Sequence, residues 1–314
     1  MVRRSRSIPG VAFGAGAYFL WGLFPAFFGL LAFAGPAEVV AQRIVWTLVV
    51  VLAVLAVSGR IRELRGLGGH VWRLAAVASA AIALNWGVYV YGVISGHVVE
   101  CALGYFINPL VTVAFGVVIF RERLAWPQWA ALALGATAVA VLTVDYGRPP
   151  IIALALACSF ATYGLVKKVI PLDALRGIAA EGIVAAPFAL VFVIALAVTG
   201  HSEFASGPGH TALMVATGPV TLVPLLLFAV AAQRVALSTM GLLQYLTPAL
   251  QMAWGVAVVH EPMPASRWAG FALIWAALAI FTAHALLRAR RARRVSRDVT
   301  TEPGPHANET QPTS

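Results

Sequence analysis

The sequence has little charge and little cysteine. Only 11% of its 314 residues are charged, whereas 61% are hydrophobic. Soluble domains typically have about 25% charged and about 45–50% apolar residues. So few charged side chains cannot cover a soluble globule of this size, which excludes soluble enzymes and DNA-binding proteins. Cys101 and Cys158 stand without paired spacing, so neither a disulfide framework nor a zinc site is indicated. We expect no metal and no cofactor.

Long apolar runs occupy most of the chain. A membrane-crossing helix needs roughly 20 predominantly apolar residues, because lipid offers no hydrogen-bond partner to the backbone. The sequence predicts ten such spans: 11–33, 37–57, 72–94, 100–119, 127–144, 151–166, 176–199, 211–231, 238–259 and 266–286. The first run is too long for a signal peptide, so we expect it to be retained. These runs predict an all-α, polytopic membrane protein.

The basic residues predict the orientation in the membrane. With a cytoplasmic N-terminus, 19 of the 22 Lys and Arg residues fall in inside segments and two, Arg148 and Arg267, in outside loops. Positively charged loops stay in the cytoplasm, so both termini are expected there, in a cell membrane. The net charge of +10 therefore marks topology, and we expect no nucleic-acid partner. Residues 1–10 form the predicted cytoplasmic N-terminus, and residues 287–314 a basic, then polar, disordered cytoplasmic tail.

An internal repeat links the two halves of the chain. A shift of 139 residues aligns 98–143 with 237–282 without a gap. The aligned identities include Pro109 with Pro248, Gly116 with Gly255, Glu122 with Glu261, and Trp129 with Trp268. Each half has five predicted spans, an odd number, so the halves must insert with opposite orientation. Glu122 is then expected on the cytoplasmic side and Glu261 on the outer side. Inverted repeats are typical of secondary transporters.

Several motifs carry a family resemblance. They are Tyr18-Phe19-Leu20-Trp21-Gly22-Leu23-Phe24-Pro25, Gln42-Arg43-Ile44-Val45-Trp46, Gly104-Tyr105-Phe106-Ile107-Asn108-Pro109-Leu110 and Leu243-Gln244-Tyr245-Leu246-Thr247-Pro248. Together they resemble the RarD-type members of the drug/metabolite transporter superfamily, the EamA-like transporters. The resemblance implies a permease of the plasma or inner membrane with two inverted five-helix EamA repeats, at 11–144 and 151–286.

Three charged residues lie within or at the edge of the predicted spans. A charge deep in lipid costs roughly 2.5–3.5 kcal/mol on insertion scales, so Arg43 is expected to face the bundle interior. Two interpretations of Arg43 stay open: contact with a substrate anion, or a structural tie to a carboxylate. Glu100 and Glu181 are the candidate carboxylate partners.

Polar and small residues form matched stripes on the fourth and ninth spans. At 3.6 residues per turn, Gln244, Pro248 and Gln251 share one face, and their repeat mates Tyr105, Pro109 and Thr112 share the equivalent face. We expect the stripes to oppose one another across a central cavity, with tight helix packing as the alternative. The prolines are candidate helix bends. The other candidate cavity residues are Trp21, Asn85, Trp86, Tyr89, Asn108 and Tyr163.

The repeat favours a secondary transporter that moves small organic metabolites or amphipathic drugs by alternating access, with proton-coupled export as one form. Two alternatives stay open: an integral membrane enzyme acting on lipids, and a passive channel. The enzyme would need clustered Asp, His and Ser at one interface, and the channel a ring of like charges; the sequence shows neither. The expected partners are the lipid bilayer and a small-molecule substrate. The sequence does not indicate an oligomeric state.

Overall fold

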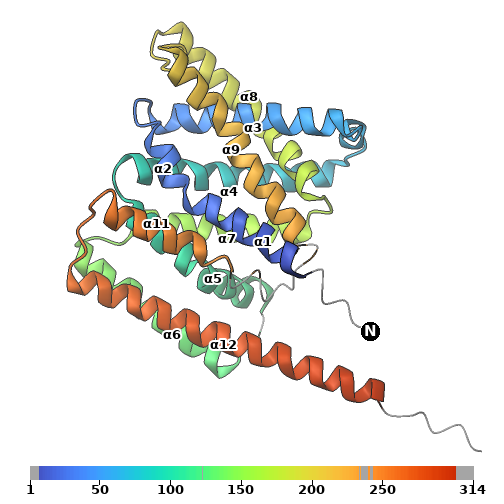
Figure 1. The fold of residues 1–314 in the computed structure, drawn as a ribbon, viewed down its shortest axis with the longest axis vertical. Coiled ribbons are helices and arrows are strands. Elements are labelled where there is room, and N and C mark those ends of the chain that lie inside the picture. The colour runs from blue at the N-terminus through green and yellow to red at the C-terminus, as the bar shows by residue number, and fades with distance from the viewer. Residues whose placement is uncertain (1–6, 122, 233, 235–239, 241–242, 302–314) are drawn as a thin grey trace, which may run out of the picture.

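The computed structural model describes residues 7–301 apart from 122, 233, 235–239 and 241–242, and all regular elements there are helical (Figure 1). They are α1 (Ser7–Gly22), α2 (Phe24–Gly29), α3 (Pro36–Val57), the 3₁₀ helix η1 (Ile61–Leu64), α4 (Gly69–Ile94), α5 (Val98–Phe120), α6 (Trp126–Tyr146), α7 (Ile151–Val169), α8 (Ala174–Val198), α9 (Pro208–Ala232), α11 (Leu246–Ala257) and α12 (Ala265–Thr301).

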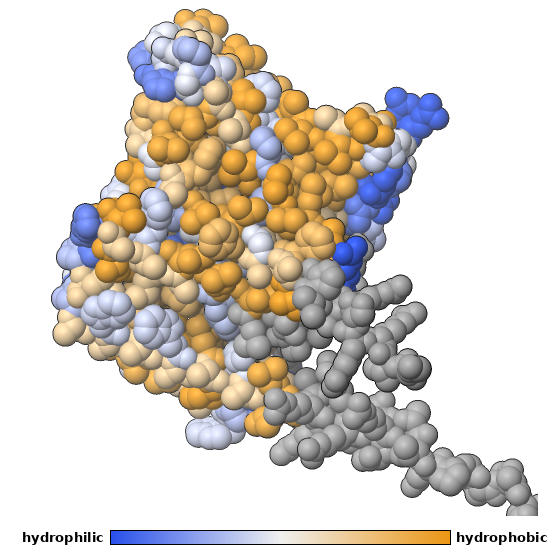
Figure 2. Space-filling model, viewed as in Figure 1, coloured by the Kyte–Doolittle hydropathy of each residue, from blue (hydrophilic) through white to orange (hydrophobic). Residues whose placement is uncertain are grey.

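The helices have the length and composition of membrane spans. Within the described residues, eight are long and apolar enough to cross a membrane, and α7 adds the shorter apolar run Ile151–Lys167. Figure 2 shows a broad apolar surface over the helices with hydrophilic residues gathered towards its edges. The fold is therefore a polytopic helical membrane fold. The predicted span 238–259 is represented by α11, and residues 238, 239, 241 and 242 lie outside the described residues.

The first predicted span, 11–33, is not one continuous helix. α1 ends at Gly22, and α2 begins at Phe24 and ends at Gly29. Pro25 sits in the first turn of α2, where its missing N–H is tolerated, whereas inside a continuous helix its ring would clash with the carbonyl of Trp21. That carbonyl instead accepts a hydrogen bond from Gln251 Nε2 at 3.2 Å.

The predicted disordered tail is partly wrong. α12 continues as a helix to Thr301, past the predicted end of the last span at 286. The residues just beyond that span are mainly Ala, Leu and Arg, which favour helix and prolong one that the membrane segment has already nucleated. The rest of the tail, 302–314, lies outside the described residues.

Helices at matching positions of the two halves lie antiparallel. Arg267, at the start of α12, contacts Asp145, at the end of α6, with 3.0 Å between Nε and Oδ2. Glu261, just after α11, accepts the N–H of Val99, at the start of α5, at 3.0 Å. In the same way, Arg60, just after the end of α3, pairs at 2.7 Å with Asp173, just before the start of α8. Two equivalent helices that lie antiparallel are related by an axis perpendicular to them, which is the geometry of an inverted repeat.

The halves are also interleaved. α1 packs against α9 and α11 of the second half, and α7 packs in the equivalent way against α4 and α5 of the first. When the two halves are interchanged, the contacts of α1 with α9 and α11 therefore correspond to those of α7 with α4 and α5. The core of the molecule consists largely of contacts between the halves.

Matching helix ends of the two halves also have similar backbone angles and similar side-chain hydrogen bonds. Arg121 and His260, which are 139 residues apart, are the described non-glycine residues with positive φ, at 54° and 58°. Both stand immediately before a repeat-matched glutamate, although Glu122 itself lies outside the described residues. At the ends of α3 and α8, the hydroxyls of Ser58 and Thr199 each donate to the carbonyl four residues earlier.

Candidate functional site

A cavity of about 450 Å³ lies between the two halves. This volume is within the range of roughly 300–1,000 Å³ that small-molecule sites occupy. Side chains of α1 to α5, α7, α8, α9 and α11 line it. It extends from Lys167 and Ala174, at the edge that also holds η1, towards Trp86 and Tyr89 deeper in the bundle.

Most of the predicted site residues meet in this cavity. Those that line it are Trp21, Arg43, Asn85, Trp86, Tyr89, Tyr105, Asn108, Pro109, Tyr163, Glu181, Gln244, Pro248 and Gln251. Two predicted residues do not. Thr112 is exposed on α5 one turn beyond Pro109, and Glu100 lies at the opposite end of the bundle. The stripe on α5 therefore turns away from the cavity after Pro109.

Arg43 is buried in the cavity wall, and no carboxylate of the described residues pairs with it. Its side chain is 3% exposed, and its Nε donates to Thr221 Oγ1 at 2.9 Å. The guanidinium carbon lies 3.9 Å from the centre of the Trp86 ring and 4.9 Å from that of Phe28. Cation–π contact stabilises a buried guanidinium but leaves its charge uncompensated. Within the described residues, no Asp or Glu is in ion-pair distance of Arg43.

The two predicted partners of Arg43 are therefore wrong. Glu181 instead pairs with Lys167, with 2.7 Å between Oε1 and Nζ, and its Oε2 accepts the Tyr163 hydroxyl at 3.2 Å. Glu100 pairs with Arg148 at 2.9 Å. Both carboxylates are thus paired with other basic residues, Glu181 with Lys167 and Glu100 with Arg148. A structural tie of Arg43 to either of these two carboxylates is therefore excluded.

An aromatic wall connects the Arg43 region with the Glu181 region. Successive ring centres are 6.1 Å apart for Phe28 and Tyr89, 5.9 Å for Tyr89 and Tyr105, and 6.1 Å for Tyr105 and Phe160. Phe160 lies 6.1 Å from Tyr163, which reaches Glu181. Tilted and edge-on rings at this spacing hold one another rigidly and present faces and edges to the cavity.

Amides fix the deeper wall. Asn85 Nδ2 donates to the Leu156 carbonyl at 3.0 Å and to Ser159 Oγ at 3.1 Å, which ties α4 to α7. Gln251 Nε2 donates to the Tyr89 hydroxyl at 3.3 Å. Within the described residues, Gln251 Oε1 and Thr47 Oγ1 are buried and have no hydrogen-bond partner. Buried polar atoms are normally paired, so these two are candidate contacts for a solute or water.

The two candidate bend prolines differ. Pro109 lies inside continuous α5, whereas Pro248 lies in the first turn of α11, where a missing N–H breaks no helical hydrogen bond. Both line the cavity. The two prolines are therefore matched in the repeat alignment but occupy different positions in their helices.

The bundle edge opposite Lys167 is held together by carboxylates. Glu100 is 1% exposed and accepts the N–H of Ile152, at the start of α7, at 3.0 Å. The Glu100 carboxylate raises the pKa of Arg148 through a hydrogen bond and its charge. Burial raises the pKa of Glu261, although the N–H of Val99 partly offsets it. These caps join helix ends on the side away from the cavity entrance.

The cavity residues that the sequence interpretation missed include Lys167, Thr47 and Thr221. Lys167 was counted only as a topology mark, because Lys at a span end usually faces the cytoplasm. Thr47 and Thr221 lie in apolar helices, where a hydroxyl usually bonds its own backbone and carries no functional signal. A Lys four residues after Tyr163 on one helix face was the available clue for Lys167.

Comparison with known proteins decides the family. Residues 8–144 match the model of the EamA-like transporter family. The protein RarD of Streptomyces exfoliatus is 51% identical, with 90% of this chain and 91% of that protein aligned. The chain belongs to the EamA-like transporter family. Within this family it is of the RarD type, and it is a membrane transporter.

Other relatives agree. The protein RarD of Escherichia coli K12 is 36% identical over 90% of this chain and 96% of that protein. The uncharacterized transporter YojE of Bacillus subtilis is 37% identical, over 87% of this chain and 93% of its own length. A crystal structure of another protein has the same fold. That protein is 18% identical to this chain, with a TM-score of 0.57 over 88% of this chain and 98% of the other.

Proposed function

We propose that this protein is a secondary transporter, without enzymatic activity, that moves small organic solutes bearing an anionic group across the cell membrane by alternating access. Metabolites and amphipathic drugs with a carboxylate or similar group are the candidate solutes. Arg43 would bind the anionic group, and the aromatic wall would contact the organic part.

One observation carries the proposal: a buried arginine, with no carboxylate partner in the part of the chain that the structure describes, lines a cavity between two inverted halves. An unpaired buried charge is costly, so a site that retains one usually has a ligand of opposite charge. Arg presents a planar fork of donors that fits a carboxylate, and only its Nε is used by Thr221. The inverted halves supply the mechanism, because exchange of their conformations opens a central site to one side and then to the other.

The positive charges support an orientation with both termini in the cytoplasm. α1 begins, and α12 ends, at the bundle edge that holds η1 (Figure 1). Arg60, Arg62 and Arg65 lie at that edge, in and beside η1. Since the cavity reaches Lys167 and Ala174 on the same side, this conformation faces the cytoplasm.

Uptake into proteoliposomes tests the proposal. Vesicles containing the purified protein are exposed to a mixture of organic acids, amines and neutral solutes, with and without a proton gradient, and the contents are analysed by mass spectrometry. We expect protein-dependent uptake of organic anions, and loss of this uptake in Arg43→Gln. Losing a hydrogen bond to a charged partner costs about 1.5–3 kcal/mol, which is roughly a tenfold to hundredfold weaker affinity.

Arg62→Gln is the matched control, because Arg62 is exposed and lies outside the cavity. It should transport like the unmodified protein. Uptake of anions that persists unchanged in Arg43→Gln would contradict the proposed site, and turnover of vesicle lipids without any solute movement would contradict a carrier.

A further inference from the structure

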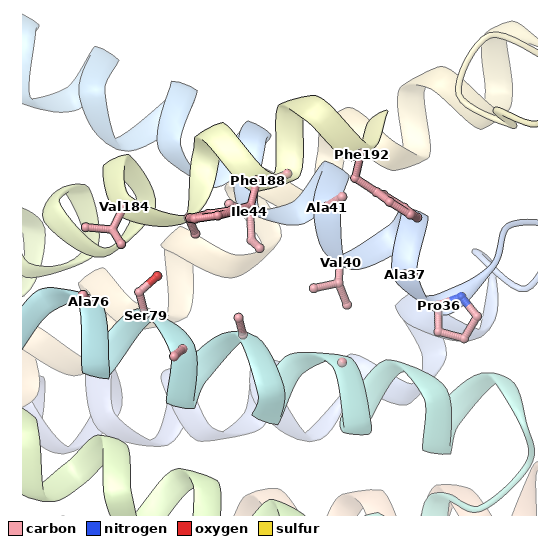
Figure 3. Close-up of a pocket in the computed structure, with 15 residues that line it drawn as sticks. Pro36, Ala37, Val40, Ala41, Ile44, Ala76, Ser79, Val184, Phe188 and Phe192 are labelled. Carbon is pink, nitrogen blue, oxygen red and sulfur yellow. The ribbon is translucent and has the colours of Figure 1, made fainter. Parts of the chain in front are cut away.

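A second hollow lies on the membrane-facing side of the bundle. It is a groove of about 740 Å³ in which α3 forms the floor and α4 and α8 form the sides (Figure 3). Figure 3 shows Val40 and Ile44 of α3 between Ser79 of α4 and Phe188 of α8. The lining is apolar apart from Ser79, whose hydroxyl is already used by the Glu181 carbonyl at 2.9 Å.

The groove faces lipid rather than water. Phe188 is 76% exposed and lies in α8, one of the most apolar spans, with a mean hydropathy of 2.4. Ala80 is exposed on α4 at the other side of the groove. Exposed apolar side chains in the middle of a spanning helix contact hydrocarbon, so the material that fills this groove is an apolar chain.

The groove adjoins the central cavity. Ile44, Ser79, Ala83 and Ala185 line both of them. Three of these four side chains are small, so the wall between groove and cavity is thin. Ile44 directly follows Arg43 in α3, and thus the groove reaches the cavity beside the proposed anion site.

The equivalent place on the other side of the bundle is closed. There α9 packs on α3 so tightly that a Cβ at Gly218 would lie 2.5 Å from the Trp46 carbonyl oxygen. Ser79 occupies the position of Gly218 when the halves are aligned by 139 residues. The opening between α4 and α8 is therefore a departure from the repeat symmetry.

We propose that the groove between α4 and α8 is a lateral portal that holds the apolar chain of an amphipathic anion while its anionic group binds at Arg43. This inference rests on the proposed function and narrows its substrate class to amphipathic organic anions that reach the cavity from the bilayer.

The portal resolves a physical conflict for such a molecule. Its charged group needs a polar site, whereas its chain is stabilised by leaving water. Lipid tails are as apolar as the groove, so the groove adds little hydrophobic attraction of its own. Its contribution is to let the chain stay in hydrocarbon while the anionic group enters the cavity.

Photolabelling tests the portal directly. The unmodified protein in vesicles of phosphatidylethanolamine and phosphatidylglycerol is labelled with dodecanoate carrying a diazirine on its chain, and the labelled peptides are identified by mass spectrometry. A phosphatidylcholine with the same diazirine chain is the second probe. We expect dodecanoate to label the groove segments 76–87 and 184–192, and unlabelled dodecanoate, but not hexanoate, to compete.

Two matched variants place a large ring at exposed alanines. Ala80→Trp fills the groove, whereas Ala195→Trp adds the same ring to an exposed position of α8 outside groove and cavity. Dodecanoate labelling of the groove should be lost in Ala80→Trp and in Arg43→Gln, and kept in Ala195→Trp. Since the first labelling experiment needs no variant, a poorly folded Ala80→Trp would not remove the test.

Two results would overturn the portal. One is equal labelling of the groove by the phosphatidylcholine probe that dodecanoate does not reduce, which would identify bulk lipid as the occupant. The other is unchanged dodecanoate labelling in folded Ala80→Trp. Failure of the proposed function would appear elsewhere, as anion uptake that Arg43→Gln leaves intact.

Discussion

The ion pair of Glu181 with Lys167 differs from the environment of Arg43, the proposed solute-binding charge in the same cavity. Both residues line it, but each satisfies the other, and Tyr163 satisfies the second carboxylate oxygen. Among the described residues, the Arg43 guanidinium contacts the Thr221 hydroxyl and aromatic rings. The difference assigns different roles to two basic residues that share one cavity: Lys167 compensates a carboxylate of the protein, and Arg43 is available to an anion.

Removal of Lys167 is expected to destabilise the protein by leaving Glu181 uncompensated. Breaking a buried pair costs about 3–5 kcal/mol, and since the Lys167 side chain is 24% exposed we expect about 2–3 kcal/mol for Lys167→Met. Thermal unfolding in detergent measures this. The double variant Lys167→Met/Glu181→Gln should recover part of the loss. A double variant less stable than Lys167→Met would contradict a compensating pair.

Residue identities predict depth in the membrane better than they predict partners. Apolar periodicity and spacing were sufficient to expect Trp86, Tyr105 and Gln251 in an interior cavity, and the structure brings them there. The contacts of Arg43 could not be derived in this way, because which side chains meet depends on the rotation and packing of helices from both halves, and the two carboxylates expected as its partners pair with Lys167 and Arg148 instead. The prediction that Thr112 lines the cavity was wrong for the same reason, since the packing of α5 leaves this side chain exposed.

Among the elements, the junction of α3 and α8 is held by charges whose effect depends on pH. Arg60 pairs with Asp173 at 2.7 Å, and Arg176 pairs with Asp173 at 2.5 Å. Burial raises the pKa of Asp173, but hydrogen bonds from Arg176 and Arg60 outweigh this and hold it below its ordinary value of 3.8. The unfolded chain then binds more protons in acid, so stability is present above the ordinary value and is lost as the pH falls below it.

Asp173→Asn is therefore expected to flatten the acid side of the stability profile. The effect should be below about 1 kcal/mol, because the carboxylate is more than a third exposed and solvent screens it. Melting temperatures between about pH 3 and pH 7 measure it. Glu203→Gln, which removes a carboxylate without an ion pair in the described part of the chain, is the control. An unaltered acid slope in Asp173→Asn would refute the assignment.

The closed contact of α3 with α9 is expected to open in the alternate state, when the halves exchange conformations. A Cβ at Gly218 would lie 2.5 Å from the Trp46 carbonyl oxygen, so Gly218→Ala cannot be accommodated without a shift of the α3 or α9 backbone. We expect Gly218→Ala to destabilise the closed contact and to change the rate of uptake, whereas the control Gly16→Ala, where a Cβ would have ordinary contact at 3.8 Å, should transport like the unmodified protein. Uptake and melting temperature that Gly218→Ala leaves unchanged would show that this contact does not govern transport.

At the scale of the whole molecule, the account depends on two halves that cross the membrane in opposite directions. Matching helices lie antiparallel at three places, and the α3 and α8 ends share one local design: Ser58 and Thr199 are each followed by a glycine with φ near +70°, at 72° and 71°. Only glycine adopts this backbone readily, and it ends both helices in the same way.

Thiol labelling at these two helix ends is the most direct test. Ser58→Cys and Thr199→Cys are made separately in a protein lacking Cys101 and Cys158, and intact cells are treated with a membrane-impermeant maleimide; both positions are exposed. The inverted arrangement predicts that the Cys at position 199 reacts in intact cells and that the Cys at position 58 reacts only after permeabilisation. Reaction of both from the same side would contradict the inverted halves, and alternating access with them.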